Sequence, residues 1–350
     1  MKIVIDSHIP FIKGVLEPYA DVVYALPEDI TPRLVKDADA LLVRTRTRIN
    51  GNLLQGSKCR FVATATIGMD HFDAEWCRNA GVTAVNAPGC NAPAVAQYVF
   101  AAIDKLWRKP LSDTTIAVVG VGNVGGIVER WARGLNMNVM LVDPPRREKE
   151  KTSGWSTLSQ AAREADIITF HTPLTRTGRH ATLHLADEVF FASLQNKPLI
   201  VNAARGAVVD NSAWLKAIEE GLISGAAIDV WEGEPGIRLD MLEKADIATP
   251  HIAGYSMDGK IRATQMVLDS LTSHFGLPEL KADSRRACSV PEFVSMDDVR
   301  ASYDIMADDN LMRKSLTKAL SKEEVARTFE NLRDFYALRD EINREKTNNK

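Results

Sequence analysis

The chain has 350 residues, of which 45% are hydrophobic and 25% are charged, and its formal net charge is −3. This composition is ordinary for a globular protein, and the length is sufficient for two or three domains. Because there is no excess of basic residues, we expect no nucleic-acid partner.

The N-terminal stretch MKIVIDSHIPF reads as a strand and lacks the long apolar core of a signal peptide. No apolar run approaches the length of a membrane span, so we expect no membrane partner. The cysteines form no C-x-x-C pair, which favours structural thiols in a reducing compartment; they are Cys59, Cys77, Cys90 and Cys288. These features together predict a cytoplasmic protein.

Short β-branched runs alternate with helical stretches in the first third of the chain. The expected strands span residues 2–7, 21–26, 40–46, 61–66 and 82–88. The expected helices lie between them, at residues 30–38 and 73–81. Alternation of this kind predicts an α/β domain with a parallel sheet.

A second series of apolar runs begins after Pro110. The expected strands span residues 115–120, 138–143, 166–173, 198–204, 225–231 and 246–251. Near-continuous apolar runs suit parallel strands that are buried on both faces. We therefore predict a second α/β domain, joined to the first at residues 106–114.

The last hundred residues are mainly helical in character. Residues 255–275 read as one amphipathic helix, which fits a return to the first domain. Strand patterns nearly vanish from Pro291 onward, and an apolar stripe at helical spacing is more typical of a packing or dimer surface than of a ligand site. The predicted domains are 1–92 with 255–280, 93–254, and a C-terminal region at 281–350. The stripe consists of Val325, Phe329, Leu332, Tyr336 and Ile342.

The strongest motif is a glycine-rich turn between a strand and a helix. Gly120 permits the tight turn, Gly122 lets the backbone approach a pyrophosphate, and Gly125 permits close packing of helix on strand. Asp143 ends the next strand, where it can accept a hydrogen bond from a ribose 2′-hydroxyl and repel a 2′-phosphate. The motif predicts a dinucleotide and favours NAD over NADP, although arginines follow at positions 146 and 147. The alternative is a glycine-rich turn without a ligand.

Polar side chains follow three successive strands after the glycine turn. Transfer of a hydride from a 2-hydroxy acid requires a cation for the carboxylate, a base for the hydroxyl proton and a carboxylate that orients the base. Arg205, His251 and Glu234 fit these roles in that order. Each alone is more often a surface arginine, a packed histidine or a turn cap. Their occurrence together at strand ends, beside a dinucleotide turn, makes coincidence improbable.

The remaining histidines give weaker signals. His180 and His184 are four residues apart and fit one helix face, but no cluster of further ligands accompanies them, so we predict no metal site. His171 is more typical of a residue that supports a loop near the cofactor, with Thr172 as the better contact.

The ordered blocks VGVGNVG, FHTPLT, NAARGAVVD, AIDVWEGEP and TPHIAG resemble the D-isomer-specific 2-hydroxyacid dehydrogenase family over about residues 1–280. The resemblance implies two Rossmann-like domains with parallel sheets: a substrate-binding domain completed by a late helix, and an NAD-binding domain. It assigns Arg205 to the substrate carboxylate, Glu234 to the histidine, and His251 to proton transfer.

Three further stretches, HIAGYS, GCNAPAVAQYVF and FVATATIGMDHFD, and the tail after Pro278 resemble members that act on a small phosphorylated 2-hydroxy acid. Such members carry a small, mainly helical C-terminal dimerisation region, which implies a homodimer. Their substrate contacts correspond to Thr45, Thr66 and Tyr255. Their cofactor contacts correspond to Gly120, Gly122, Asn123, Val124, Gly125, Asp143, Thr172, Ala203, Ala204, Arg205, Asp229 and Gly254. The chain departs from the family at Gln97, where many members have glutamate, and its tail is short.

Arg44, Arg46 and Arg48 follow a strand of the first domain. If the strand continues that far, alternation places all three on one face. We hypothesise that one or more of them receives the substrate phosphate; the alternative is a solvated edge.

Two other functions remain open at this stage. One is a dehydrogenase of another phosphorylated acid, such as 3-phosphoglycerate, although the tail lacks an evident βαββαβ regulatory module. The other is a non-catalytic NAD(H)-sensing scaffold, because the family also includes co-repressor-like members. A scaffold does not need the three catalytic side chains, so their presence argues against it.

Overall fold

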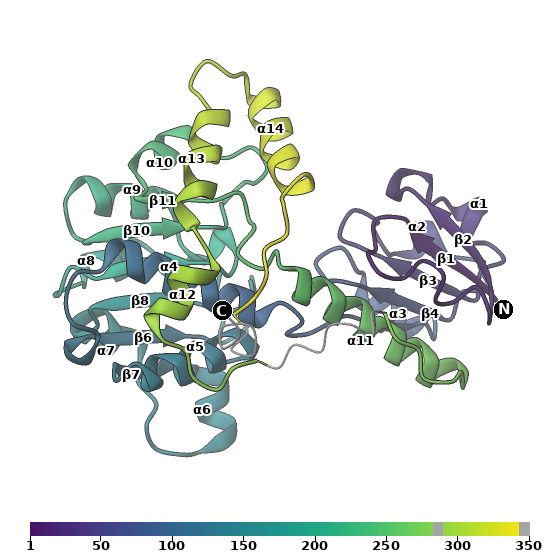
Figure 1. Cartoon of the computed structure of the whole chain (residues 1–350), viewed down its shortest axis with the longest axis horizontal. Helices are drawn as coiled ribbons and strands as arrows, with labels where there is room; N and C mark the ends of the chain where they lie inside the picture. Colours follow the sequence, from purple (N-terminus) through teal and green to yellow (C-terminus); the bar gives the residue numbers. More distant parts are fainter. Residues whose placement is uncertain (283–289, 343–350) are drawn as a thin grey trace. The chain divides into compact units, whose positions relative to one another are not determined.

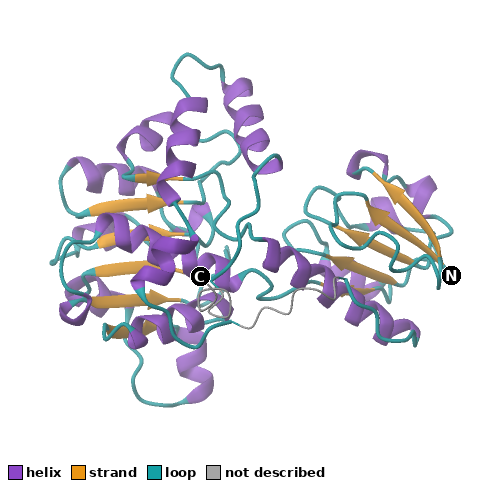
Figure 2. Cartoon of the chain, in the orientation of Figure 1, coloured by secondary structure: helices purple, strands orange, loops and turns teal. Residues whose placement is uncertain are grey.

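The computed structural model describes residues 1–282 and 290–342. The chain divides into two compact units, Met1–Asn91 with Ser256–Cys288 and Ala92–Tyr255 with Ser289–Lys350. Each unit contains one parallel sheet with helices packed against it (Figures 1 and 2). The predicted α/β fold with two parallel sheets is thereby confirmed.

Unit 1 is built on a five-stranded sheet in the order β2-β1-β3-β4-β5. The strands are β1 (Lys2–Asp6), β2 (Asp21–Ala25), β3 (Ala40–Val43), β4 (Phe61–Thr64) and β5 (Thr83–Val85). Because β3 ends at Val43, the following arginines lie in a loop. The strand does not continue as far as these arginines, so alternation along it does not place them on one face.

A helix distant in sequence covers part of this sheet. It is α11 (Met257–Phe275), which begins at the N-cap Ser256 and ends at Gly276 in the left-handed conformation. Its residues Val267 and Leu271 share a core with Ile5 of β1 and other strand residues, and α11 lies beside the sheet in Figure 1. The shorter helices of unit 1 are η1 (Pro27–Asp29), α1 (Pro32–Val35), α2 (Gly51–Leu54) and α3 (Ala74–Asn79).

Unit 2 is built on a six-stranded parallel sheet in the order β11-β10-β9-β8-β6-β7. The strands are β6 (Thr115–Val119), β7 (Asn138–Val142), β8 (Ile167–Phe170), β9 (Leu199–Asn202), β10 (Gly225–Ile228) and β11 (Ile247–Ala248). Since β7 and β8 lie on opposite sides of β6, the strand order reverses there. Ligands of open α/β sheets bind at such a reversal, outside the carboxyl ends of the strands.

Helices cover both faces of this sheet, as Figure 2 shows. Alternate residues of β6 serve separate cores: Ala117 and Val119 pack on one side, and Ile116 and Val118 on the other. From α4 to α10, the helices of unit 2 in chain order are α4 (Ala92–Leu106), η2 (Leu111–Asp113), α5 (Asn123–Gly134), α6 (Pro144–Glu150), α7 (Leu158–Glu164), α8 (Glu188–Ala192), η3 (Gly206–Val208), α9 (Asn211–Glu219) and α10 (Leu239–Lys244).

The sequence patterns had predicted a separate C-terminal region at 281–350. Residues 290–342 instead form part of unit 2. Their helices are α12 (Met296–Ser302), α13 (Ile305–Ser315) and α14 (Lys322–Asp334), and α13 contacts β11 (Figure 1). Val325 and Phe329 of the predicted stripe are buried in the core of unit 2. Tyr336 and Ile342 lie beyond the end of α14, so the single helix predicted for the stripe is wrong. Residues 283–289 and 343–350 of the predicted region lie outside the described residues.

Within the described ranges 1–282 and 290–342, no helix combines the length and apolar character needed to cross a bilayer.

Candidate active site

The glycine turn after β6 forms a tight backbone cradle. Gly120 has a φ of +89°, and a Cβ there would lie 2.8 Å from the backbone N of Thr172. A Cβ on Gly125 would lie 2.0 Å from the carbonyl oxygen of Gly120. Space remains open at Gly122, the N-cap of α5, which makes no side-chain capping hydrogen bond. The first N–H groups of α5 are therefore available to an anion such as a pyrophosphate.

Asp143 lies against this turn. Its Oδ2 accepts a hydrogen bond of 2.9 Å from Val121 N, and its Oδ1 accepts one of 3.0 Å from Arg146 N at the start of α6. The guanidinium of Arg146 donates to the Val121 carbonyl and forms an ion pair of 2.7 Å with Glu150. An acid and an arginine thus share the position where a dinucleotide ribose would bind.

The residues after β8 present unpaired polar atoms beside Gly120. His171 is half-buried, and desolvation of its ring lowers its pKa to about 3, so the ring is neutral. Its Nε2 lies 3.0 Å from Thr169 Oγ1, whereas its Nδ1 is buried without a hydrogen-bond partner among the described residues. Thr172 Oγ1 is also buried and has no hydrogen-bond partner among the described residues. Buried polar atoms normally have partners, so these atoms and the glycine cradle together fit a bound dinucleotide.

His251 and Glu234 form a hydrogen-bonded pair. The distance from His251 Nδ1 to Glu234 Oε1 is 2.6 Å, and each side chain is about a quarter exposed, at 28% and 26%. Glu234 Oε2 also accepts a hydrogen bond of 3.2 Å from Trp231 N. Burial alone would raise the pKa of Glu234, but His251, this N–H group and Arg333 lower it overall. This arrangement is one in which a carboxylate can orient the imidazole through Nδ1 and leave Nε2 for proton exchange.

The loop that carries His251 is hydrogen-bonded to a buried carboxylate, that of Asp229. Asp229, at the end of β10, accepts hydrogen bonds of 2.8 Å from Ile252 N and 3.0 Å from Ala253 N. Thr249 Oγ1 donates to the same side chain over 2.7 Å. Burial raises the pKa of Asp229 despite these donors and the nearby His251. His251 itself has a φ of +57°, an uncommon conformation for a residue other than glycine.

Arg205 lies in the turn between β9 and η3. Its Nη1 donates a hydrogen bond of 2.8 Å to the Ala204 carbonyl. Asn202, which we did not single out from the sequence, braces this turn: its amide donates to the Arg205 carbonyl and accepts from Ala204 N, both over 3.1 Å. The sequence signal for Asn202 was its position as the polar last residue of an otherwise apolar strand, just before Arg205.

A close backbone contact joins the Arg205 turn to the Glu234 turn. A Cβ on Gly206 would lie 2.0 Å from the carbonyl carbon of Trp231, so only glycine fits there. Because Trp231 N also donates to Glu234, the segments after β9 and β10 form one packed edge. The structure therefore brings the predicted residues Arg205, Glu234 and His251 to neighbouring loops of the same sheet edge.

The predicted substrate contacts lie in different units. Tyr255 belongs to unit 2, next to Gly254, and its ring centroid lies 6.0 Å from that of Tyr336. Thr45 and Thr66 belong to unit 1, where Thr45 is exposed and Thr66 Oγ1 lies 2.7 Å from Thr64 Oγ1.

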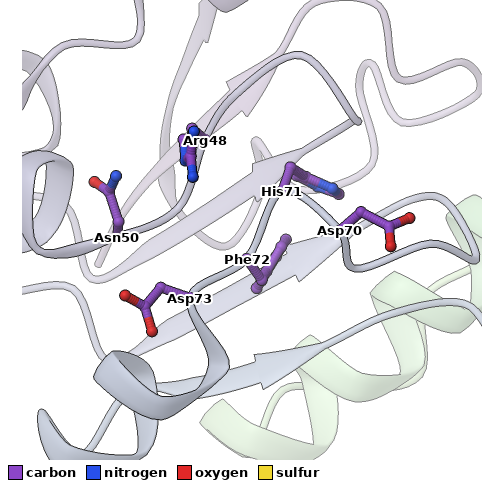
Figure 3. A pocket seen from close by; sticks show the side chains of 6 residues that line it. All are labelled: Arg48, Asn50, Asp70, His71, Phe72 and Asp73. Atoms are coloured by element: carbon purple, nitrogen blue, oxygen red, sulfur yellow. The ribbon is translucent and has the colours of Figure 1, made fainter. Parts of the chain in front are cut away.

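The arginines after β3 have distinct surroundings. Arg44 is half-buried; it donates to the His8 carbonyl over 3.4 Å, and its buried Nε has no hydrogen-bond partner among the described residues. Arg46 is exposed. Arg48 lines a pocket of about 200 Å³ with the carboxylates of Asp70 and Asp73, as Figure 3 shows. Two carboxylates in one small pocket disfavour a phosphate there.

His180 and His184 do not lie on a helix, so the expectation that they share a helix face is wrong. His180 Nε2 lies 3.1 Å from Glu148, and His184 Nε2 lies 2.6 Å from Glu232. No group of three or more potential metal ligands occurs in the described part of the chain.

Comparisons with known proteins agree with this geometry. Residues 95–253 match the family model for the D-isomer specific 2-hydroxyacid dehydrogenase NAD binding domain. Over 349 residues the chain is 47% identical to an erythronate-4-phosphate dehydrogenase of Bacteroides thetaiotaomicron, covering 97% of both proteins. An erythronate-4-phosphate dehydrogenase of Yersinia pestis is 42% identical over 297 residues, covering 84% of this chain and 79% of the relative.

The fold also resembles that of D-lactate dehydrogenase from Aquifex aeolicus, solved with NAD and lactic acid. The TM-score is 0.67 at 24% identity, covering 79% of this chain and 96% of the other.

Proposed function

Because the chain belongs to the D-isomer-specific 2-hydroxyacid dehydrogenase family, we propose that it oxidises 4-phospho-D-erythronate to 2-oxo-3-hydroxy-4-phosphobutanoate in the biosynthesis of pyridoxal 5′-phosphate (vitamin B6). The cofactor is NAD. The observation that carries this proposal is the 2.6 Å His251–Glu234 pair on the sheet edge that also holds Arg205 and the glycine turn.

The side chains of this edge have complementary tasks. Arg205 binds the substrate carboxylate through two parallel hydrogen bonds. His251 takes the proton of the 2-hydroxyl group, and the Glu234 carboxylate stabilises the resulting imidazolium. Bound NAD would supply the acceptor for the hydride from carbon 2. The N–H groups at the start of α5, together with Thr172 and Asp143, would hold the dinucleotide.

A parallel assay of two substrates tests the proposed function. Purified protein is mixed with NAD and either 4-phospho-D-erythronate or 3-phosphoglycerate. Nicotinamide absorbance and the 2-oxo product are followed together, because a cofactor that stays bound would hide net reduction. Preference for the erythronate supports the proposal. Preference for phosphoglycerate would move the substrate to another phosphorylated acid, and binding of NADH without turnover of either acid would favour the sensing scaffold.

Replacement of Asp143 by serine should lower the preference for NAD over NADP. Serine can still cap α6, whereas the bond to the ribose hydroxyl and the repulsion of a 2′-phosphate are lost. A hydrogen bond to a charged group contributes about 1.5–3 kcal/mol, so the ratio of kcat/KM for NAD to that for NADP should fall by about 10-fold to 100-fold. Asp143→Asn keeps the shape of the side chain, so its change in this ratio should show how much of the preference is due to the charge alone. An unchanged ratio in both variants would remove Asp143 from cofactor selection.

We infer that Arg44 binds the substrate phosphate in preference to Arg48, because its buried Nε lacks a partner and Arg48 shares its pocket with two carboxylates. Arg44→Gln should raise KM for the phosphorylated acid by about tenfold or more and spare a 2-hydroxy acid without a phosphate. Arg48→Gln is the matched control and should change neither value appreciably. An equal rise for both acids in Arg44→Gln, or a larger rise in Arg48→Gln, would contradict the assignment.

We also infer a cytoplasmic homodimer. Cys59 and Cys77 are buried free thiols, as is typical of a reducing compartment. Apolar side chains are exposed on the C-terminal helices, at Leu311 of α13 and at Phe335 just after α14, where the exposed fraction is 85%. Light scattering of the native protein and of a Phe335→Ser variant measures the mass in solution and the contribution of this surface.

A further inference from the structure

The segment after α14 brings an arginine onto the loop that carries His251. The Arg339 guanidinium donates hydrogen bonds to the carbonyls of Ile252 at 3.0 Å and Tyr255 at 3.2 Å, and also to the carbonyl of Ala253. It donates a fourth, of 3.1 Å, to the carbonyl of Ala94 in α4. One side chain thus joins the catalytic loop, α4 and the C-terminal segment.

Two side chains of opposite charge hold the backbone of the His251 loop: a carboxylate binds its N–H groups, and a guanidinium binds its carbonyl groups. The Asp229 carboxylate accepts hydrogen bonds from the N–H groups of Ile252 and Ala253, and Arg339 donates to the carbonyls of the same two residues. Loop carbonyls outside a helix or sheet need such donors when they are buried. A guanidinium suits this task because its five N–H donors form a rigid fork.

Arg339 is itself held in place on every side. Its guanidinium lies over the Tyr303 ring at 4.2 Å from the centroid and donates to Tyr336 Oη over 3.2 Å. Its Nε donates to Gln97 Oε1 over 3.4 Å, which gives the residue that departs from the family pattern a partner in the C-terminal segment. Burial alone would lower the pKa of Arg339, but Tyr303, Tyr336 and Asp308 raise it overall, so the side chain remains a cation.

A second arginine, Arg333 of α14, contacts the Tyr255 side chain at the end of this loop. Arg333 forms an ion pair of 2.9 Å with Glu330 and a hydrogen bond with the Tyr255 side chain, and its charge acts on Glu234. The C-terminal segment therefore faces both the loop backbone and the side chains of the catalytic edge.

We propose that Arg339 is a positioning residue for the reaction: it fixes the backbone of Ile252–Tyr255, and through it the orientation of His251 toward Glu234. The part of this proposal that concerns turnover rests on the proposed function. The part that concerns loop order does not, so the two are tested by separate measurements.

The test compares Arg339→Gln with a matched arginine of the same region. Arg313 of α13 also donates to two backbone carbonyls, of Leu242 and Ala245, and pairs with Asp309, but its carbonyl partners lie at the end of α10 and not within residues 249–256. Arg313→Gln therefore controls for the general loss of an arginine that binds backbone carbonyls. Arg339→Lys keeps the charge with fewer and less fixed donors.

Hydrogen–deuterium exchange over residues 249–256 is the first readout. Arg339→Gln should increase exchange there, Arg339→Lys should increase it less, and Arg313→Gln should leave it near the native value. The second readout is steady-state kinetics, where Arg339→Gln should lower kcat by roughly tenfold to a hundredfold with little change in KM for NAD, because a small misplacement of a catalytic group has effects of this size.

Two results would overturn the proposal. One is equal exchange over residues 249–256 in the Arg339 and Arg313 variants. The other is a folded Arg339→Gln protein with native kcat. If the native protein turns over neither acid, the proposed function fails, and the exchange result still decides whether Arg339 orders the loop.

Discussion

His251→Ala should lower kcat for 4-phospho-D-erythronate by about a hundredfold or more, the usual scale for loss of a general base. The physical reason is the 2.6 Å pair: Glu234 holds Nδ1, so Nε2 is the nitrogen that remains for the substrate proton. Stopped-flow or steady-state measurement of product formation at saturating acid and NAD gives this value. Turnover near that of the native enzyme would remove His251 from the chemistry.

Glu234→Gln separates the two parts of this pair. Glutamine keeps the size of the side chain but removes the charge that stabilises a protonated imidazole. We expect a smaller fall in kcat than for His251→Ala, because the imidazole remains and only the charge that stabilises its protonated form is lost. His184→Ala is a suitable control, since His184 also pairs with a glutamate, Glu232, over 2.6 Å. Comparable losses of kcat in His251→Ala and His184→Ala would indicate a general structural effect and not a role in the chemistry.

The sheet edge was predictable because strand ends are a strong sequence signal. Apolar runs that end in a polar residue placed Arg205 and His251 at the carboxyl ends of β9 and β11, and parallel pairing brings such ends together. The glycine turn was equally clear, because its backbone geometry excludes a side chain at Gly120.

The C-terminal contribution was not predictable by the same means. Arg339 lies 88 residues beyond His251, in a short irregular segment that the apolar stripe had predicted to be helical, and it contacts backbone carbonyls that any residue provides. The apolar stripe indicated burial but not its partner: Val325 and Phe329 pack inside the same unit, whereas the exposed residue is Phe335. Position relative to the catalytic loop depends on how α13 and α14 pack, which only the three-dimensional structure gives.

Arg205→Leu should cause the other large loss, in kcat/KM for the hydroxy acid. Two hydrogen bonds between charged groups contribute about 1.5–3 kcal/mol each, so their loss should lower kcat/KM by more than about a hundredfold. Arg205→Lys should recover part of this, because lysine keeps the charge but not the paired donors. Initial rates over a range of acid concentrations at saturating NAD measure the effect.

The control for this variant is Arg238→Leu, which removes an exposed arginine of the same unit that pairs with Asp240 over 2.7 Å. An exposed pair of this kind contributes little to stability, so its loss should leave kcat/KM near the native value. Binding of NADH, followed by its fluorescence, should persist in Arg205→Leu, because the turn backbone is braced by Asn202 and by the Gly206–Trp231 contact independently of the side chain. Loss of NADH binding together with turnover would instead mean that Arg205 supports the fold of the turn, and its assignment to the substrate carboxylate would have to be withdrawn.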